Sequence, residues 1–354
     1  MVMSTAAEET CVVRPGEELD VLRLAAYLRE QLPTISGELT VRQFPHGHSN
    51  LTYLLRSGSE EWVLRRPPFG NKVKSAHDMG REYRVLSGLS VIFSPAPRPL
   101  AFCADESILG APFYVMERRR GLILRRQWPP ELPANPMLLR EMCGSLIDAL
   151  ADLHEINPGE AGLSDFGKPT GYVERQIEGW TKRYSAAETD QVPEMEQVAK
   201  WLAAHLPTAS GASLIHNDFK FDNVAFDPER PQHVSSIFDW EMATIGDPLM
   251  DLGTTLAYWV EASEIEQLSA SFIGPTWLPG ALTRKELVDR YVERRGLGAC
   301  DMSYYYVFGL FKIAVIVQQI YARFVRGLTS DSRFASLDAC VCQLARQAAR
   351  VVSA

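Results

Sequence analysis

The chain has 354 residues, of which 46% are hydrophobic and 23% are charged, and its formal net charge at pH 7 is -8. This balance is typical of a globular protein and excludes a disordered chain, which would carry fewer apolar residues. The acidic charge argues against a nucleic-acid-binding protein, because such proteins usually present a basic surface. The six cysteines have no C-x-x-C spacing, which predicts reduced thiols rather than a zinc site or a redox motif.

Two segments bear on targeting. Met1–Thr10 has neither a basic segment nor an apolar core, so we expect no signal peptide and a cytoplasmic location. The longest apolar stretch, Val307–Val317, is interrupted by Lys312 and is too short to cross a bilayer. The pattern therefore predicts a buried helix at that place and no interaction with a membrane.

The first third of the chain predicts a helical extension over residues 1–37 and a small antiparallel sheet over residues 38–118. Leucines at helical spacing in Glu17–Gln31, followed by Pro33, predict the helix of the extension. Alternating apolar and polar residues separated by turns predict about five strands in the sheet. The expected strands are Leu39–Phe44, Leu51–Leu55, Trp62–Arg65, Leu100–Cys103 and Phe113–Met116, with one inserted helix, Ala76–Leu89.

Residues 119–354 predict a larger, mainly helical part, and the character of the sequence changes near residues 116–122. In this part only Val224–Phe226 and Val234–Phe238 have the pattern of strands, and the short turn between them predicts a hairpin. The expected helices are Pro136–His154, Tyr172–Tyr184, Met195–Leu206, Asp251–Val260, Arg284–Arg294, Met302–Arg326 and Phe334–Val352.

The segment Leu214–Asp251 carries the residues that point to chemistry. His216, Asp218 and Asn223 form the pattern H-x-D-x-x-x-x-N, and Asp239 stands at the end of the predicted hairpin that follows. Phosphoryl transfer from ATP needs a carboxylate that engages the acceptor hydroxyl. It also needs hard oxygen ligands for Mg²⁺, which carboxylate and amide groups supply. The spacing therefore predicts an ATP- and Mg²⁺-dependent kinase.

The strings HNDFKFDNVAF and IFDWEMATIGDPLMDLG resemble the catalytic segment of the protein-kinase-like fold. They are similar above all to the aminoglycoside phosphotransferase and choline kinase superfamily. Within it they resemble the kinase-like domains that occur alone in bacteria or fused to acyl-CoA dehydrogenases. The resemblance runs from Leu39 to Arg326. It implies an α+β fold with two lobes, a small antiparallel N-lobe with one helix and a larger, mainly helical C-lobe.

The resemblance also implies a role for each residue of the motif. Asp218 matches the catalytic aspartate that accepts or orients the acceptor hydroxyl. Asn223 and Asp239 match the magnesium ligands. His216 is expected to support the loop backbone, and Lys220 is expected to contact the γ-phosphate and offset charge in the transition state.

We expect three further aspartates of this segment to have structural roles. Asp222 is expected at the surface or in a turn. Asp247 and Asp251 flank Pro248 and precede a predicted helix, so we expect them to cap that helix and to brace the loop.

The residues expected to bind ATP lie in the first third of the chain. Arg65 stands where kinases place a lysine on the third strand, and Glu82 on the inserted helix is its expected partner. The arginine departs from the general kinase pattern, but it keeps the positive charge and can bind phosphate bidentately. The remaining contacts are expected from the nucleotide-covering turn and from the hinge between the lobes, at Gly47, Ser49, Asn50, Met116, Glu117 and Arg118.

The expected acceptor is a hydroxyl group of a small molecule. The aromatic and amide side chains of the helical part favour an uncharged or acidic metabolite, such as a hydroxyacid or its acyl-CoA ester, over a polycationic aminoglycoside. A silent nucleotide-binding scaffold, an aminoglycoside-type antibiotic kinase and a metal-dependent phosphohydrolase remain as alternatives, and the oligomeric state stays open, a homodimer included. The candidate substrate contacts are Trp180, Tyr184, Trp259, Gln318, Tyr321 and Arg323.

Overall fold

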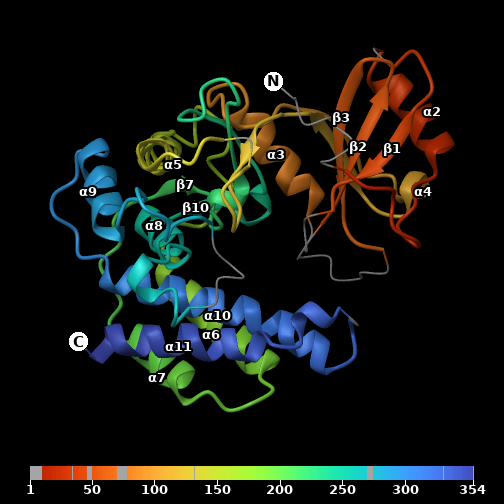
Figure 1. The fold of residues 1–354 in the computed structure, drawn as a ribbon. Helices are drawn as coiled ribbons and strands as arrows, with labels where there is room; N and C mark the ends of the chain where they lie inside the picture. The colour runs from red at the N-terminus through yellow and green to blue at the C-terminus, as the bar shows by residue number, and fades with distance from the viewer. Residues whose placement is uncertain are drawn as a thin grey trace. The chain divides into compact units, whose positions relative to one another are not determined.

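The computed structural model describes residues 10–33, 35–45, 50–69, 78–130, 132–268, 274–329 and 331–353. The chain forms two compact units. The first unit is Met1–Arg120 with Ser236–Glu241, and the second unit is Gly121–Ser235 with Met242–Ala354. A short segment of the later chain thus packs as part of the first unit. Figure 1 gives the elements of both units.

The first unit is built on a five-stranded antiparallel sheet with the strand order β1-β2-β3-β5-β4. The five predicted strands are confirmed, with ends that differ by up to two residues. The elements are α2 (Val21–Gln31), β1 (Thr40–Gln43), β2 (Leu51–Ser57), β3 (Glu60–Arg66), α3 (Met79–Leu89), β4 (Pro99–Cys103), α4 (Glu106–Leu109) and β5 (Phe113–Glu117).

Capping residues set the helix boundaries in the first unit. Helix α2 begins at Val21 rather than at Glu17, because the Asp20 side chain accepts a hydrogen bond from the Arg23 N–H and caps the helix. The four-residue helix α4 was not predicted. Asp105 caps it and Gly110 ends it in the left-handed conformation, so it has no room for an apolar repeat.

Helix α2 shares a core with the sheet. Leu24 and Leu28 of this helix are fully buried, and they belong to the same cluster as Leu55 and Leu64 of the sheet. The predicted helical extension is therefore part of the packing of the first unit, since its apolar face covers the sheet.

The second unit is mainly helical, with a two-stranded sheet, β7-β10, and a three-stranded sheet in the order β6-β8-β9. Its helices are α5 (Pro136–Glu155), α6 (Tyr172–Ala187), α7 (Pro193–Ala204), α8 (Pro248–Ala257), α9 (Arg284–Arg294), α10 (Ser303–Val325) and α11 (Leu337–Ser353). Its strands are β6 (Leu122–Ile123), β7 (Ser213–Ile215), β8 (Val224–Phe226) and β10 (Thr244–Gly246), with short 3-10 helices η1 (Phe221–Asn223), η3 (Ala262–Glu264) and η5 (Ser332–Phe334). Strand β9 (Val234–Ile237) and the 3-10 helix η2 (Trp240–Met242) each share residues with the segment Ser236–Glu241 of the first unit.

The prediction that only two segments of the helical part form strands was wrong. Strands β6, β7 and β10 are two or three residues long, too short to show an alternating pattern. They form through pairing with distant segments, as when Thr244 pairs with Ile215. Helix α8 begins at Pro248 rather than at Asp251, because Asp247 accepts a hydrogen bond from the Leu249 N–H and Pro248 fits the first turn.

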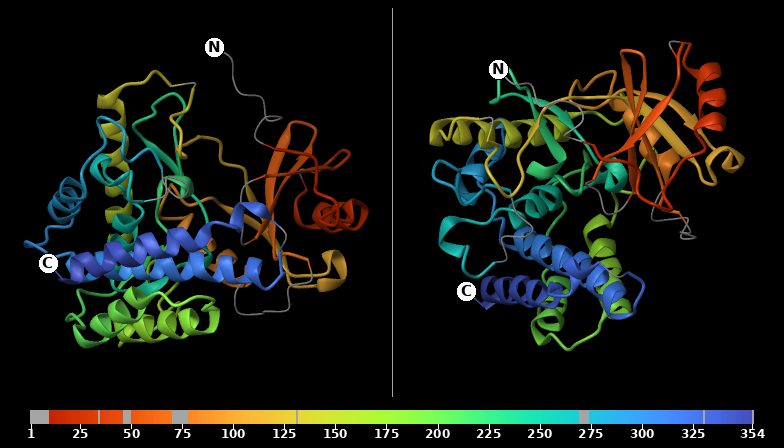
Figure 2. Two further views of the ribbon diagram at one scale, coloured as in Figure 1. Left: turned by 60° about the horizontal axis from the view of Figure 1, so that its bottom comes forward. Right: turned by 45° about the vertical axis from the view of Figure 1, so that its right-hand side comes forward.

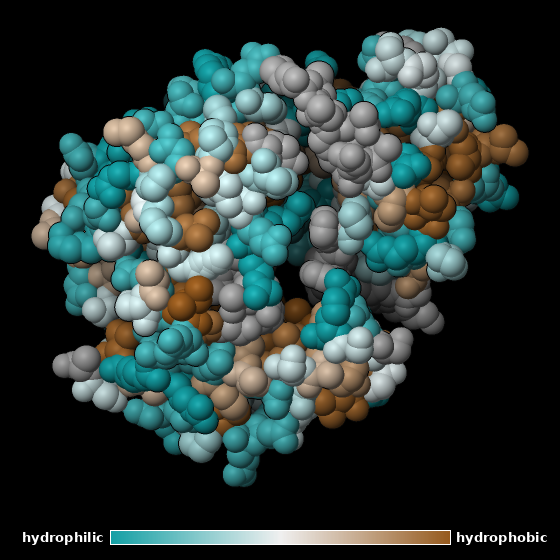
Figure 3. All heavy atoms as spheres, in the orientation of Figure 1, coloured by the Kyte–Doolittle hydropathy of each residue, from teal (hydrophilic) through white to brown (hydrophobic). Residues whose placement is uncertain are grey.

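Helix α10 packs against α6, α7, α8 and α11. Figure 2 shows α10 and α11 running side by side in both views. By length and composition α10 could cross a membrane, but 67% of its apolar window is buried inside the structure. On the face drawn in Figure 3, hydrophilic residues are interspersed with small groups of hydrophobic ones. The apolar character of α10 is thus explained by packing within the second unit, as the sequence predicts.

Candidate active site

The predicted catalytic loop begins directly after β7, which ends at Ile215. Asn217 in this loop has a φ of 68°, in the left-handed region that most residues avoid. Asparagine tolerates this conformation better than most side chains. The turn at Asn217 lies between His216 and Asp218, the first two polar residues of the motif.

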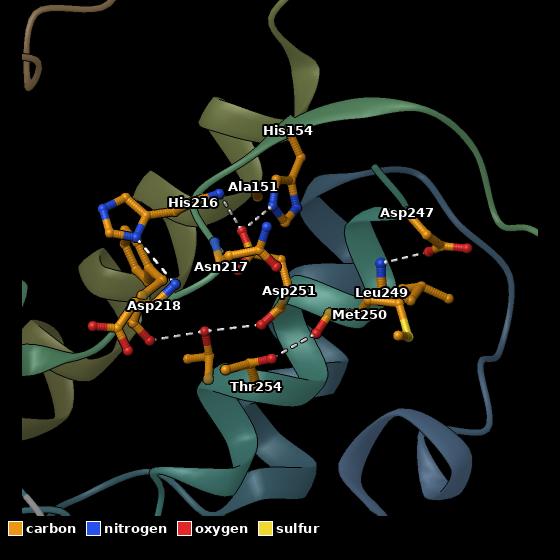
Figure 4. Close-up of polar contacts among 12 residues, drawn as sticks. Ala151, His154, His216, Asn217, Asp218, Asp247, Leu249, Met250, Asp251 and Thr254 are labelled. Carbon is orange, nitrogen blue, oxygen red and sulfur yellow. Dashed lines mark hydrogen bonds and ion pairs between the residues drawn. The ribbon is translucent and has the colours of Figure 1, made fainter. Parts of the chain in front are cut away.

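The side chain of Asp251 on α8 binds the backbone of this turn (Figure 4). Its Oδ2 accepts the His216 N–H and its Oδ1 accepts the Asn217 N–H, both at 2.7 Å. Burial raises the pKa of Asp251, but the hydrogen bond from His154 and the nearby positive charge of Lys312 act against it, and this pKa lies below its ordinary value. The carboxylate is therefore ionised, and the predictions that Asp251 braces the loop and that Asp247 caps a helix are confirmed.

His154 on α5 completes the support of Asp251. Its Nε2 lies 3.1 Å from Asp251 Oδ2 and its Nδ1 lies 2.6 Å from the hydroxyl of Tyr291. Burial lowers the pKa of His154, so the ring is neutral. The neutral tautomer that satisfies both contacts donates from Nε2 to the carboxylate and accepts from Tyr291.

Asn217 is fixed by three more groups that the sequence analysis did not identify. Tyr172 donates its hydroxyl to Asn217 Oδ1 at 3.1 Å, and Asn217 Nδ2 donates to the carbonyl of Met242 at 3.0 Å. The buried ammonium of Lys312 donates to the Asn217 carbonyl. Burial lowers the pKa of Lys312 to about 8. The lysine inside the apolar run of α10 was a visible signal in the sequence, but nothing in the sequence indicated its partner.

Asp218 is surrounded by three side-chain donors. Tyr258 donates its hydroxyl to Oδ1 at 2.7 Å. Lys220 Nζ and Asn223 Nδ2 donate to Oδ2 at 2.6 and 2.9 Å. Burial raises the pKa of Asp218, but the charge of Lys220 and the hydrogen bonds from Lys220 and Tyr258 outweigh it, so this pKa lies below its ordinary value. The carboxylate is therefore negatively charged and held in one orientation.

His216 and Asn223 stabilise the two ends of the loop. His216 Nδ1 accepts the Asp218 N–H at 3.3 Å, which places its ring in support of the backbone. Asn223 Nδ2 also donates to the Asp218 carbonyl at 2.9 Å. In the described part of the chain, Asn223 Oδ1 receives no hydrogen bond, so this amide oxygen is available to a cation.

A small open pocket of the second unit is lined by Lys220 and Tyr258, two of the side chains that donate to Asp218. The rings of Phe221 and Trp259 pack against each other in the same wall, with centroids 5.3 Å apart and planes tilted by 30°. Asp222 at the rim is exposed, as predicted. The pocket thus combines an aromatic surface, one ammonium and one carboxylate. Its lining residues are Lys220, Phe221, Asp222, Thr255, Tyr258, Trp259, Gly274 and Thr276.

Trp259 is the candidate substrate contact that lines this pocket. Gln318 donates to the Ala187 carbonyl and to Thr189 Oγ1 at 2.9 Å each, so its amide supports the turn after α6. Trp180 and Tyr184 are buried core residues of α6. Of the other candidates, Tyr321 is half-buried and Arg323 is exposed on α10.

The second part of the predicted site lies in the first unit and centres on Arg65 of β3. Its Nη1 lies 2.9 Å from Glu82 Oε1 on α3, and its Nη2 lies 2.9 Å from Asp239 Oδ1. Burial alone would lower the pKa of Arg65, but the two carboxylates raise it, so the guanidinium stays charged. The predicted Arg65–Glu82 pair is thus present, and the same arginine also holds Asp239, whose φ is 65°.

The other predicted nucleotide contacts are only partly described. Gly47 and Ser49 lie outside the described residues, whereas Asn50 donates from Nδ2 to Glu241 Oε2 at 2.8 Å. At the predicted hinge, Met116 is buried on β5 and Glu117 accepts the Arg98 N–H at 2.8 Å. The roles of these residues toward adenine and phosphate stay predictions.

The arginine cluster at the hinge has a structural partner. Arg118, Arg120 and Arg56 all pair with Glu61 of β3. These contacts lower the pKa of Glu61 to about 2, although burial acts in the opposite direction. The cluster therefore connects β2 and the segment that follows β5 to β3.

The comparisons with known proteins agree with this arrangement. Residues 40–285 match the profile of the phosphotransferase enzyme family. The chain is 34% identical over 332 residues to acyl-CoA dehydrogenase family member 11 of Rattus norvegicus, which covers 91% of the chain but only 42% of that relative. The chain thus spans less than half the length of this relative.

Solved structures show the same fold. A candidate aminoglycoside phosphotransferase from Ralstonia eutropha JMP134 superposes with a TM-score of 0.78 and 30% identity, covering 95% of this chain and 99% of that one. Aminoglycoside phosphotransferase APH(4)-Ia, solved with ADP and hygromycin B, has a TM-score of 0.60 and 15% identity, covering 94% of this chain and 99% of that one. The predicted α+β kinase-like fold and the predicted family resemblance are confirmed.

Proposed function

The chain belongs to the phosphotransferase enzyme family, and on this premise we propose that it transfers the γ-phosphate of ATP to a hydroxyl group of a small molecule. One observation carries the proposal. Asp218 is an ionised carboxylate held by three donors on an H-x-D-x-x-x-x-N loop, and it lies beside a pocket. This is the arrangement that phosphoryl transfer to an alcohol requires of a protein.

In the proposed reaction the acceptor oxygen forms a bond to the γ-phosphorus, and the bond between that phosphorus and ADP breaks. The hydroxyl proton passes to Asp218. Because Asp218 has a lowered pKa, its main contribution is to orient the acceptor hydroxyl, and it takes the proton as the new bond forms. Lys220, bonded to Asp218, supplies positive charge where the transferred phosphoryl group would pass.

We assign the magnesium ligands to Asn223 and Asp239. An amide oxygen and a carboxylate suit Mg²⁺, which is usually held by one or two protein oxygens, phosphate oxygens and water. When bound, Mg²⁺ neutralises the charge of the phosphates. Arg65 orients Asp239 through the contact between Nη2 and Oδ1, and Glu82 in turn fixes the guanidinium.

We further propose that the acceptor is a hydroxyacid or its acyl-CoA ester. The pocket offers the aromatic pair Phe221 and Trp259 and a single carboxylate, Asp222, whereas a polycationic aminoglycoside calls for several acidic groups. The relatives named as acyl-CoA dehydrogenase family members support an acyl-chain substrate. An aminoglycoside-type kinase is the second candidate, since the Ralstonia eutropha structure carries that description.

The test is a screen for ADP release from MgATP with hydroxy acids, hydroxyacyl-CoA esters and aminoglycosides as acceptors. Asp218→Asn keeps the shape of the side chain but removes the charge, and we expect it to lower kcat about 100-fold or more. Asp227→Asn is the matched control, because Asp227 supports only the turn after β8, through the Glu229 N–H at 2.8 Å. Normal turnover by Asp218→Asn would refute the assigned role. Tight ATP binding without ADP release for any acceptor would favour a silent scaffold.

A further inference from the structure

The hydrogen bonds on Asp218 are distributed unequally over its two oxygens. Oδ2 accepts from both Lys220 and Asn223, whereas Oδ1 accepts from Tyr258 and from no other group in the described ranges. A carboxylate oxygen offers about two acceptor positions. Oδ2 is therefore filled, and the free position is on Oδ1, next to the Tyr258 hydroxyl.

Tyr258 is placed by the same helix that braces the catalytic loop. It follows Ala257 as the C-terminal cap of α8, and its N–H bonds to the Thr254 and Thr255 carbonyls at 3.3 and 3.2 Å. Asp251, which holds the loop backbone, lies on the first turn of α8. One helix thus fixes the backbone of the loop at one end and the side chain of Asp218 at the other.

The Tyr258 side chain also contacts Lys220. The Lys220 ammonium lies 4.6 Å from the centroid of the Tyr258 ring, within the range of a cation–π contact. Burial raises the pKa of Tyr258, and the neighbouring Asp218 charge raises it further. The phenol therefore stays protonated and remains a hydrogen-bond donor at physiological pH.

We propose that Tyr258 is a positioning residue for the reaction: its hydroxyl fixes the carboxylate of Asp218 so that Oδ1 receives the acceptor hydroxyl at the pocket. This inference rests on the proposed function. Tyr258 gains and loses no proton during the reaction, because the proton of the acceptor passes to Oδ1 of Asp218. Its contribution is orientation, and a misplaced catalytic group can cost about 100-fold in rate.

The experiment compares Tyr258→Phe with Tyr304→Phe. Tyr304 is a buried tyrosine of the same unit whose hydroxyl donates to the Leu202 carbonyl at 3.0 Å, away from the loop. The assay is cleavage of MgATP with 3-hydroxybutyryl-CoA as probe acceptor, and with water as acceptor in parallel. We expect Tyr258→Phe to lower the rate about 10- to 100-fold with KM for ATP changed less than about twofold, and Tyr304→Phe to leave both constants unchanged.

A crystal structure of Tyr258→Phe gives a readout that needs no acceptor. We expect the Asp218 side chain to rotate away from its present orientation or to occupy two orientations. The loop backbone should keep its hydrogen bonds to Asp251. In the double variant with Asp218→Asn, the second change should cost nothing further. If Asp218→Asn is as active as the unmodified enzyme, the proposed function fails. If Asp218→Asn is slow but Tyr258→Phe keeps the normal rate and an unchanged Asp218, the inference on Tyr258 alone is wrong.

Discussion

Asn217 and Asp239 are the two residues other than glycine with a positive φ in the described part of the chain, Asn217 next to Asp218 in the second unit and Asp239 in the first unit. A conformation of this kind persists only where the surroundings impose it. Asp251, Tyr172 and Lys312 hold Asn217, and Arg65 holds Asp239. Both turns are therefore maintained by side chains that take no part in the proposed chemistry, with the exception of Arg65.

The first prediction concerns Asp251→Asn. The new amide can accept only one of the two loop N–H groups well, and it turns an NH₂ group toward the other, leaving buried donors without an acceptor. We expect a loss of about 3 kcal/mol in the free energy of unfolding and a clear fall in kcat, measured by urea denaturation and by ADP release. Asp289→Asn on the exposed side of α9 is the control. Equal stability and equal rate for both variants would contradict the bracing role.

The H-x-D-x-x-x-x-N motif and the hairpin after it led to the prediction of Asp218, Asn223 and Asp239, whose roles toward ATP and Mg²⁺ stay predictions. Tyr258 could not be predicted, since its contact with Asp218 joins residues 40 positions apart and follows no fixed motif. Arg65 and Glu82 were paired correctly, but the extra bond to Asp239 required a structure.

Between elements, the contact of α8 with α10 decides how Tyr258 and Asp251 are placed. Gly253 and Gly309 face one another where the two helices cross. A Cβ added at Gly309 would lie 2.8 Å from Ala257 Cβ and even closer to the Gly253 carbonyl oxygen. Backbone cannot move aside as a flexible side chain does, so the two glycines set the close approach of these helices.

We expect Gly309→Ala to destabilise the protein by about 2 kcal/mol or more, because overpacking exceeds the roughly 1 kcal/mol that alanine adds to a helix. The proposed activity should fall with it, since α8 carries Asp251 and its cap is Tyr258. Gly298→Ala, where a new Cβ meets nothing within 4 Å, should change stability by less than about 0.5 kcal/mol. Thermal unfolding of the two variants tests this, and similar melting temperatures would be inconsistent with a backbone contact.

Elements with a signal in their own sequence were predictable, whereas the strands that depend on pairing with a distant segment were not. The bounds of α9 (Arg284–Arg294) and β8 (Val224–Phe226) agree with the predicted ranges residue for residue. Strands β7 and β10 form only because they pair with each other across some thirty residues, so their neighbourhood in sequence contains little sign of them. The pocket likewise joins η1, the end of α8 and residues near position 275, which no local pattern connects.

The whole chain has a net charge of -8, yet one cluster of the first unit has more positive than negative side chains. Arg56, Arg118 and Arg120 share the single carboxylate of Glu61 in the first unit. The Glu61 side chain is only 11% exposed, so solvent screens these pairs weakly. The acid stability of the first unit should therefore depend on this one group more than on its exposed ion pairs.

The pKa of Glu61 is about 2 in the folded protein against an ordinary 4.5, so the unfolded chain binds more protons between these values. Its contribution, about 3 kcal/mol for a shift of this size, is complete above pH 4.5 and is lost as the pH falls toward 2. We expect Glu61→Gln to lower the free energy of unfolding at pH 7 and this deficit to shrink to less than half by pH 3, whereas Glu60→Gln, at an exposed neighbouring site, should change little. Urea denaturation at pH 7, 5, 4 and 3 measures this. If Glu61→Gln were less stable than the unmodified protein by the same free energy at all four pH values, lost packing, and not the ionised carboxylate, would explain the effect.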